Sequence, residues 1–149
     1  MTNANPYWFR HYATVPGHVA EFICKHGDGR ITERSYQRYT QPGPGTVVTV
    51  THLGNIVGLI GFVKRDGEAT SLIIVVHKQH RNKGLGKELV RRILIALRVQ
   101  RLDCKIIVAE DNEPSKNVFQ AHGLQVTETL ERRRDSGVFT ALVYLAATP

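Results

Sequence analysis

Residues 71–97 constrain the fold more than any other part of the chain, because three patterns follow one another there without a break. The β-branched run Ser71–Val76 is typical of a central strand that is buried on both faces. A polar loop with glycines follows, and from Gly84 to Arg101 the apolar residues take helical spacing. The apolar face of this helix consists of Leu85, Leu89, Ile93, Leu94, Ala96 and Leu97. The sequence therefore predicts a strand, a loop and a long helix in direct succession.

The junction between this strand and this helix predicts an anion-binding site. The first N–H groups of a helix have no partner within the helix, and the helix dipole makes that end positive. Gly84 and Gly86 allow a phosphate to approach the backbone without an intervening side chain. The basic side chains of the segment are Arg81, Lys83 and Lys87.

Two well-known phosphate loops do not match this segment. A Walker loop requires a glycine separated by four residues from a Gly-Lys pair that precedes Ser or Thr, but Arg81 stands at that place and Glu88 follows Lys87. A dinucleotide fingerprint requires a third glycine three residues after Gly86, where Leu89 stands. The pattern that remains is Arg-x-x-Gly-x-Gly between a strand and a long helix.

The other elements predict one α/β domain over residues 1–149, with a mixed central sheet flanked by helices in the order β-α-α-β-β-β-α-β-α-β-β. Hairpins impose antiparallel pairs and a helical crossover imposes a parallel pair. Besides the segment above, we expect strands at Tyr7–Tyr12, Thr46–Leu53, Ile56–Lys64, Lys105–Ala109, Leu124–Leu130 and Val138–Ala146. We expect helices at Gly17–Lys25, Ile31–Tyr39 and Glu113–His122, and a loop at Gln41–Gly45.

The pattern Arg81-x-x-Gly84-x-Gly86 resembles the acetyl-coenzyme A motif of the GNAT superfamily of N-acetyltransferases. Residues 112–124 are similar to the family's second motif, in which an Asn, a small residue, an aromatic residue and a Gly-Phe pair occur at this spacing. The order of the predicted elements matches the family's fold over essentially the whole chain. The resemblance implies an acyltransferase that uses acetyl-coenzyme A as cosubstrate.

Composition restricts the partners and the compartment. Lys and Arg total 20 against 13 acids, a formal charge of +7, which favours polyanionic partners such as coenzyme A or nucleic acid. The longest apolar run, Ile56–Val63, is too short to span a bilayer, so we expect a cytoplasmic protein with no membrane partner. We expect Cys24 and Cys104 to be small buried hydrophobes in a reducing compartment rather than a disulfide framework.

The resemblance also implies roles for individual residues. Backbone groups near Ile74 and Val76 would pair with pantetheine as an added strand, because the strand from Lys105 splays away, and the Ile74 N–H would polarise the thioester carbonyl. The N–H groups from Asn82 through Gly86 would hold the pyrophosphate. The cofactor-binding residues implied in this way are Ile74, Val75, Val76, Arg81, Asn82, Lys83, Gly84, Leu85, Gly86, Lys87, Asn112, Ser115 and Phe119.

The acid and the base of the reaction are less clearly marked. Many family members have Tyr at the position of Phe119, and Phe119 cannot protonate a leaving thiolate. Glu68 is the nearest acid and the candidate base, although an acid beside the Asp66-Gly67 turn is often a solvated hairpin residue. Direct attack or a water relay is the alternative.

The acceptor side is predicted from basic residues on the second helix. Arg30, Arg34 and Arg38 recur at every fourth residue, so their side chains share one helix face. This face is either solvated surface or an attraction for an acidic acceptor such as a carboxylate-rich protein or a tRNA. His52, at the end of a strand, either faces the acceptor cleft or is an ordinary residue near a turn. No metal is expected, because His77, His80 and His122 lack the spacing of metal ligands.

The sequence leaves two functions of different classes. The first is an N-acetyltransferase that acts on a primary amine of a protein, peptide or small molecule by direct attack in a ternary complex. The alternative is a non-catalytic domain that binds acyl-coenzyme A or docks on nucleic acid. The sequence leaves the oligomeric state open between monomer and homodimer.

Overall fold

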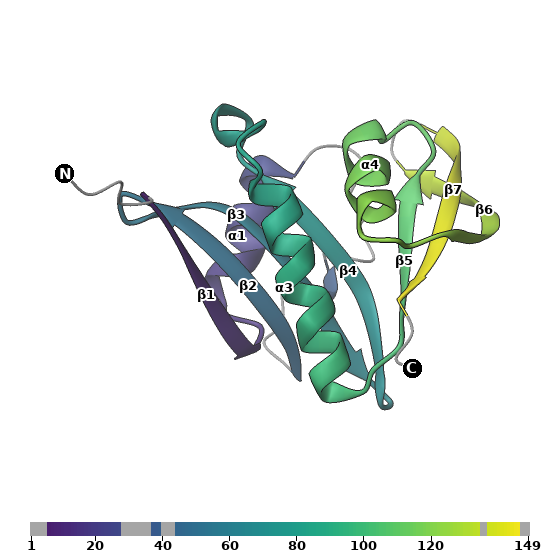
Figure 1. Ribbon diagram of the computed structural model, residues 1–149, viewed down its shortest axis with the longest axis horizontal. Helices are drawn as coiled ribbons and strands as arrows, with labels where there is room; N and C mark the ends of the chain where they lie inside the picture. The colour runs from purple at the N-terminus through teal and green to yellow at the C-terminus, as the bar shows by residue number, and fades with distance from the viewer. Residues whose placement is uncertain (1–5, 28–36, 40–43, 135–136, 147–149) are drawn as a thin grey trace.

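The computed structural model describes residues 6–27, 37–39, 44–134 and 137–146. In these residues one sheet has the strand order β1-β2-β3-β4-β5-β7-β6. Its strands are β1 (Tyr7–Thr14), β2 (Pro44–His52), β3 (Asn55–Arg65), β4 (Glu68–Val76), β5 (Cys104–Ala109), β6 (Val126–Arg134) and β7 (Gly137–Ala146). The helices are α1 (His18–His26), α3 (Leu85–Gln100) and α4 (Glu113–Ala121), and η1 (Lys78–His80) is a 3-10 turn. The predicted mixed α/β architecture is confirmed (Figure 1).

The sheet is covered by helices on both faces, and a separate apolar cluster lies under each layer (Figure 1). Helix α3 buries Leu89, Ile93 and Leu97 completely or almost completely against one face. Helix α1 buries Val19 and Ile23 against the other face. The apolar face predicted from the helical spacing is therefore the buried face of α3, which packs across β2, β3 and β4.

Two details differ from the sequence predictions, and a third prediction lies mostly outside the described residues. Strand β2 begins at Pro44, so Pro44 and Gly45 belong to the strand rather than to a loop. Strands β2 and β3 approach closely at Gly45, where a Cβ would lie 2.5 Å from the carbonyl oxygen of Phe62. Cys24 is exposed on α1, whereas Cys104 is buried, and both thiols are free. Of the predicted helix Ile31–Tyr39, only residues 37–39 are described, and they are helical.

The sheet opens between β4 and β5. These parallel strands are paired at a single position, Ala69 with Cys104. By contrast, β5 pairs with β7 along its whole length, and β3 pairs with β4 from Arg65 to Gly58. Beyond Ala69 the two neighbouring strands diverge toward the start of α3, as Figure 1 shows. The backbone edges of β4 and β5 that face each other are consequently left without strand partners.

Candidate functional site

The backbone of β4 presents two residues to this opening. The His77 N–H donates to the Val57 carbonyl at 2.7 Å, which defines a hydrogen-bonded pair between β3 and the end of β4. Hydrogen-bonded positions alternate along an antiparallel pair, so Val75 directs its backbone groups toward β3. Ile74 and Val76 direct theirs toward the opening, as predicted for these two residues. The backbone groups of Val75 point toward β3, so only its side chain is available to a ligand.

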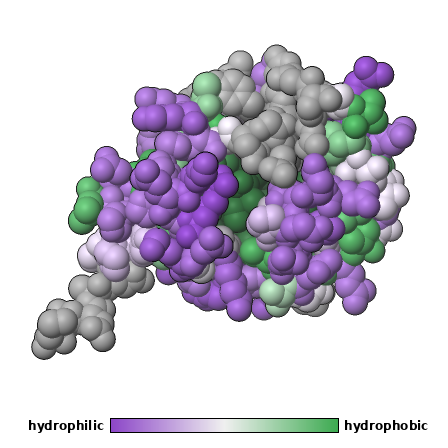
Figure 2. All heavy atoms as spheres, turned by 90° about the horizontal axis from the view of Figure 1, so that it is seen from above, coloured by the Kyte–Doolittle hydropathy of each residue, from purple (hydrophilic) through white to green (hydrophobic). Residues whose placement is uncertain are grey.

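A cavity of about 1420 Å³ occupies the opening between β4 and β5. Its walls include the first turn of α3 and five residues of the α4 segment, Asn112, Pro114, Ser115, Val118 and Phe119. On the α1 side the walls include His26 and Arg38. Figure 2 shows a hollow with an apolar floor between hydrophilic side chains. The cavity thus runs through the sheet and meets both helical layers.

The loop before α3 has the backbone shape of an anion site. Asn82 and Gly84 both have left-handed backbone angles, with φ of 63° and 77°. Such turns next to a helix N-terminus direct successive N–H groups into one concavity. Gly86 faces β4, since a Cβ added there would lie 3.8 Å from Ile74 Cδ1. Leu85 is buried in the core, so only its backbone is available to a ligand.

Charged side chains around the loop are arranged to leave positive charge at its surface. Arg81 Nε donates to the Val76 carbonyl at 3.0 Å, which anchors the guanidinium at the end of β4. Glu88, the acid of the first turn, is paired with Arg91 at 2.6 Å and Arg92 at 3.0 Å. The hydrogen bond from Arg91 is the main reason that the pKa of Glu88 falls to about 2. The Glu88 carboxylate is therefore paired with two arginines of α3.

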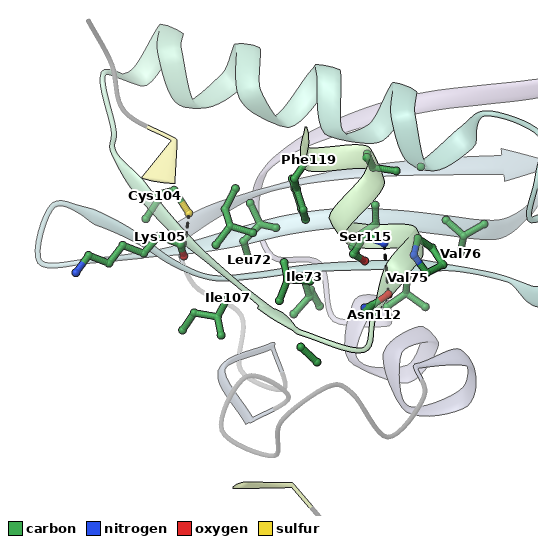
Figure 3. Close-up of a pocket in the computed structure, with 18 of the residues that line it drawn as sticks. Leu72, Ile73, Val75, Val76, Cys104, Lys105, Ile107, Asn112, Ser115 and Phe119 are labelled. Carbon is green, nitrogen blue, oxygen red and sulfur yellow. Dashed lines mark hydrogen bonds between the residues drawn. The ribbon is translucent and has the colours of Figure 1, made fainter. Parts of the chain in front are cut away.

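The start of α4 forms the wall opposite β4 (Figure 3). Asn112 caps the helix, because its Oδ1 accepts a hydrogen bond from the Ser115 N–H at 3.4 Å. Phe119 is only 1% exposed, and its ring lies 5.9 Å from that of Tyr144. Asn112 was predicted to bind the cofactor, and in the structure it caps α4 and lines the same cavity.

The predicted base and acceptor residues occupy different parts of the site. Glu68 lines the cavity at the start of β4, just before the Ala69–Cys104 pair, and its side chain is exposed. Ile74 is six positions further on, which is roughly 20 Å along a strand at about 3.3 Å per residue. Arg38 lines the cavity, and its Nη1 donates to Thr70 Oγ1 at 3.2 Å. Arg30 and Arg34 lie outside the described residues.

A group of histidines beside the loop was missed by the sequence analysis. His52 packs against Tyr7 and against His80, with ring centroids 5.1 and 5.0 Å apart. His26 packs in the same way against His77 at 4.4 Å. His26, His52 and the His77–His80 turn come from separate parts of the chain, so no sequence spacing signals their proximity. Across the described part of the chain, no set of three or more His, Cys, Asp or Glu side chains is arranged to hold a metal.

Comparison with known proteins identifies the family. The sequence pattern of the acetyltransferase (GNAT) family matches residues 12–124. The chain belongs to this GNAT family. The GNAT assignment accounts for the sheet that opens between β4 and β5 and for the glycine loop that follows β4. Comparison of the sequence with curated proteins gave no significant match. None of the described helices is both long enough and apolar enough to cross a membrane.

Solved structures share this GNAT fold over almost the whole chain. A GNAT acetyltransferase from Streptococcus pneumoniae has 15% identity and a TM-score of 0.72, with 96% of this chain and 99% of that chain covered. A GNAT acetyltransferase from Elizabethkingia anophelis with acetyl-CoA bound has 11% identity and a TM-score of 0.69, covering 95% and 98%. The ribosomal-protein-S18-alanine N-acetyltransferase from Escherichia coli has 13% identity and a TM-score of 0.71, covering 95% and 96%.

Proposed function

We propose that this GNAT protein transfers the acetyl group of acetyl-CoA to a primary amine by direct attack in a ternary complex. The observation that carries the proposal is the opening between β4 and β5, which leads to the glycine loop and extends through the sheet. Acetyl-CoA enters from the side of α3 and α4, and the acceptor amine approaches from the side of α1. The reaction takes place in the cytoplasm.

The residues around the opening supply a surface for each part of acetyl-CoA. The backbone groups of Ile74 and the N–H of Val76 pair with pantetheine, and the N–H groups from Asn82 through Gly86 hold the pyrophosphate. The Ile74 N–H then stabilises negative charge on the thioester oxygen as the amine attacks. The new C–N bond forms as the C–S bond breaks, the amine loses a proton and the coenzyme A thiolate gains one.

The state of the cavity cysteine supports direct attack over an acyl-enzyme. Cys104 lines the cavity but is only 1% exposed. Burial raises the pKa of its thiol to about 12, so almost none of it is thiolate at neutral pH. A thiol in this state is a poor nucleophile toward a thioester.

Water carries the protons in this proposal. Phe119 has no hydroxyl, and Glu68 stands about 20 Å from Ile74 along β4 at roughly 3.3 Å per residue. The cavity is open to solvent at the mouth near the loop, so water can reach both the amine and the thiolate. Glu68 remains a candidate base only because it lines the cavity.

The acceptor is proposed to be acidic, because Arg38 lines the α1 side of the cavity. The test measures coenzyme A release with a thiol reagent across polyamines, neutral peptides and carboxylate-rich peptides. We expect the acidic peptides to be used best, and Arg38→Glu to raise their Michaelis constant about tenfold without changing saturation by acetyl-CoA. Added salt should lower turnover on acidic peptides more than on neutral ones. Binding of acetyl-CoA without release from any amine would instead support the non-catalytic alternative.

Phe119→Tyr tests the role of the missing hydroxyl. The Phe119 side chain lines the cavity, so a tyrosine hydroxyl would be placed at its wall. We expect turnover to rise by up to about tenfold, below the ~10²–10⁴ of an evolved general acid. Affinity for acetyl-CoA should change less than turnover does. Equal or lower turnover, measured with saturating acetyl-CoA, would mean that water already protonates the thiolate adequately.

A further inference from the structure

Four histidines form a continuous chain of rings at the end of the sheet where β4 stops. His26 packs on His77 at 4.4 Å, His77 on His80 at 5.6 Å and His80 on His52 at 5.0 Å between ring centroids. We call these residues the histidine cluster. Its members come from α1, from the end of β2 and from the turn η1 with its cap. The Tyr7 ring closes the cluster on the β1 side, 5.1 Å from His52 and 5.9 Å from His80.

The histidine cluster borders the proposed phosphate site. His26 and His80 both line the cavity, together with the glycines of the loop. His80 immediately precedes Arg81, whose side chain is fixed to the end of β4. Lys83, in the loop itself, is close enough to act on the charge of His80. An anion held by the loop therefore lies beside His80.

Hydrogen bonds distinguish His80 from its neighbour His77. His77 Nδ1 accepts from the Gln79 N–H at 3.1 Å, so this nitrogen carries no proton while the cap of η1 is formed. His80 Nδ1 lies 3.1 Å from the Tyr7 hydroxyl. A hydroxyl donates to a neutral imidazole and accepts from an imidazolium, so this hydrogen bond is kept in both states.

The surroundings of His80 lower its pKa in the free protein. Its pKa is lowered first by burial and then by His52, His77 and Lys83. The neighbouring His26 has its pKa lowered by burial, by His77 and by Lys25. The groups that act on His80, including the Tyr7 hydroxyl, are all neutral or cationic. A polyanion beside it would reverse this balance.

We propose that His80 is part of the phosphate site and that binding of acetyl-CoA converts it to the imidazolium form, with uptake of a proton from solution. This inference rests on the proposed function, because it needs the phosphates at the loop. Negative charge near an imidazole favours its charged form, so the pKa of His80 rises on binding. By linkage, affinity is then highest at low pH and falls as pH rises through the pKa of the bound state.

The test is isothermal titration of the full chain with coenzyme A at pH 6.5, in buffers of different ionisation enthalpy. We expect uptake of up to about 0.5 proton, and affinity about tenfold higher at pH 6 than at pH 8, because a rise of about one pKa unit on binding changes affinity at most tenfold. Dephospho-coenzyme A serves as a second ligand, since the 3′-phosphate of coenzyme A itself titrates near pH 6. Uptake should persist with it if the phosphates at the loop are responsible.

Variants assign the proton to a residue. His80→Gln should abolish the uptake and flatten the pH dependence, while coenzyme A still raises the melting temperature. His18→Gln is the matched control, because His18 lies on α1 and packs against Tyr12, away from the cluster. Tyr7→Phe should reduce the uptake without removing it. Normal binding with no uptake, or uptake unchanged in His80→Gln, would overturn the inference. Absence of any binding would overturn the proposed function as well.

Discussion

Gly86→Val is expected to abolish the rise in melting temperature that acetyl-CoA gives the wild-type protein. At a ligand concentration of 100 Kd the wild-type shift corresponds to about 2.7 kcal/mol, or roughly 5–10 °C for a chain of this size. Gly86 faces β4 beside the loop, and the valine side chain would occupy the space that the phosphate needs. The measurement is a thermal melt with and without saturating acetyl-CoA.

Gly86 is a sharper position for this test than Gly84. Gly84 has φ of 77°, so any side chain there strains the backbone even without ligand. A Cβ at Gly86 meets its nearest atom at 3.8 Å, which is ordinary contact. Gly17→Val is the matched control, because Gly17 caps α1, has φ of −61° and has open space around a Cβ. A full ligand-induced shift of the melting temperature in Gly86→Val would contradict the assignment of the pyrophosphate to this loop.

Leu89→Ala should lower the free energy of unfolding by about 2–5 kcal/mol, the range for a buried leucine. Leu89 is completely buried where α3 packs on the sheet, and its Cδ1 lies 3.6 Å from the place of a Cβ on Gly58. Ile95→Ala on the same helix is the control, since Ile95 is 45% exposed. We expect the control to cost less than about 1 kcal/mol. Similar losses in both variants, measured by urea unfolding, would contradict this account of the α3 interface.

The elements that were predicted correctly are those with a clear repeat of apolar residues or a clear terminating residue. The β-branched run before Val76 and the apolar face of α3 each follow one repeat, because one burial environment extends along the whole element. The start of β2 was placed too late because Pro44 and Gly45 resemble a turn, whereas Gly45 is required by its distance from Phe62 across the strands. Local sequence does not contain that distance.

The site was predictable only where it is continuous in sequence. The glycine loop and the α4 segment are contiguous runs, so their motifs are visible in the chain. The histidine cluster joins residues as far apart as His26 and His80, and the packing of α1 on the sheet together with the pairing of its strands brings them together. Glu68 and Ile74 lie near opposite ends of one extended strand, so a residue close in sequence is remote from the proposed thioester.

The single pair between Ala69 and Cys104 divides the sheet into two plates, β1–β4 and β5–β7, that touch at one end and diverge from there. Each plate ends in a row of peptide groups without a strand partner. A pantetheine chain in this wedge would act as a strut that satisfies one of these rows and holds the plates at a fixed angle. The cosubstrate would then be a temporary structural member of the sheet, and each release of coenzyme A would return the protein to a less braced form.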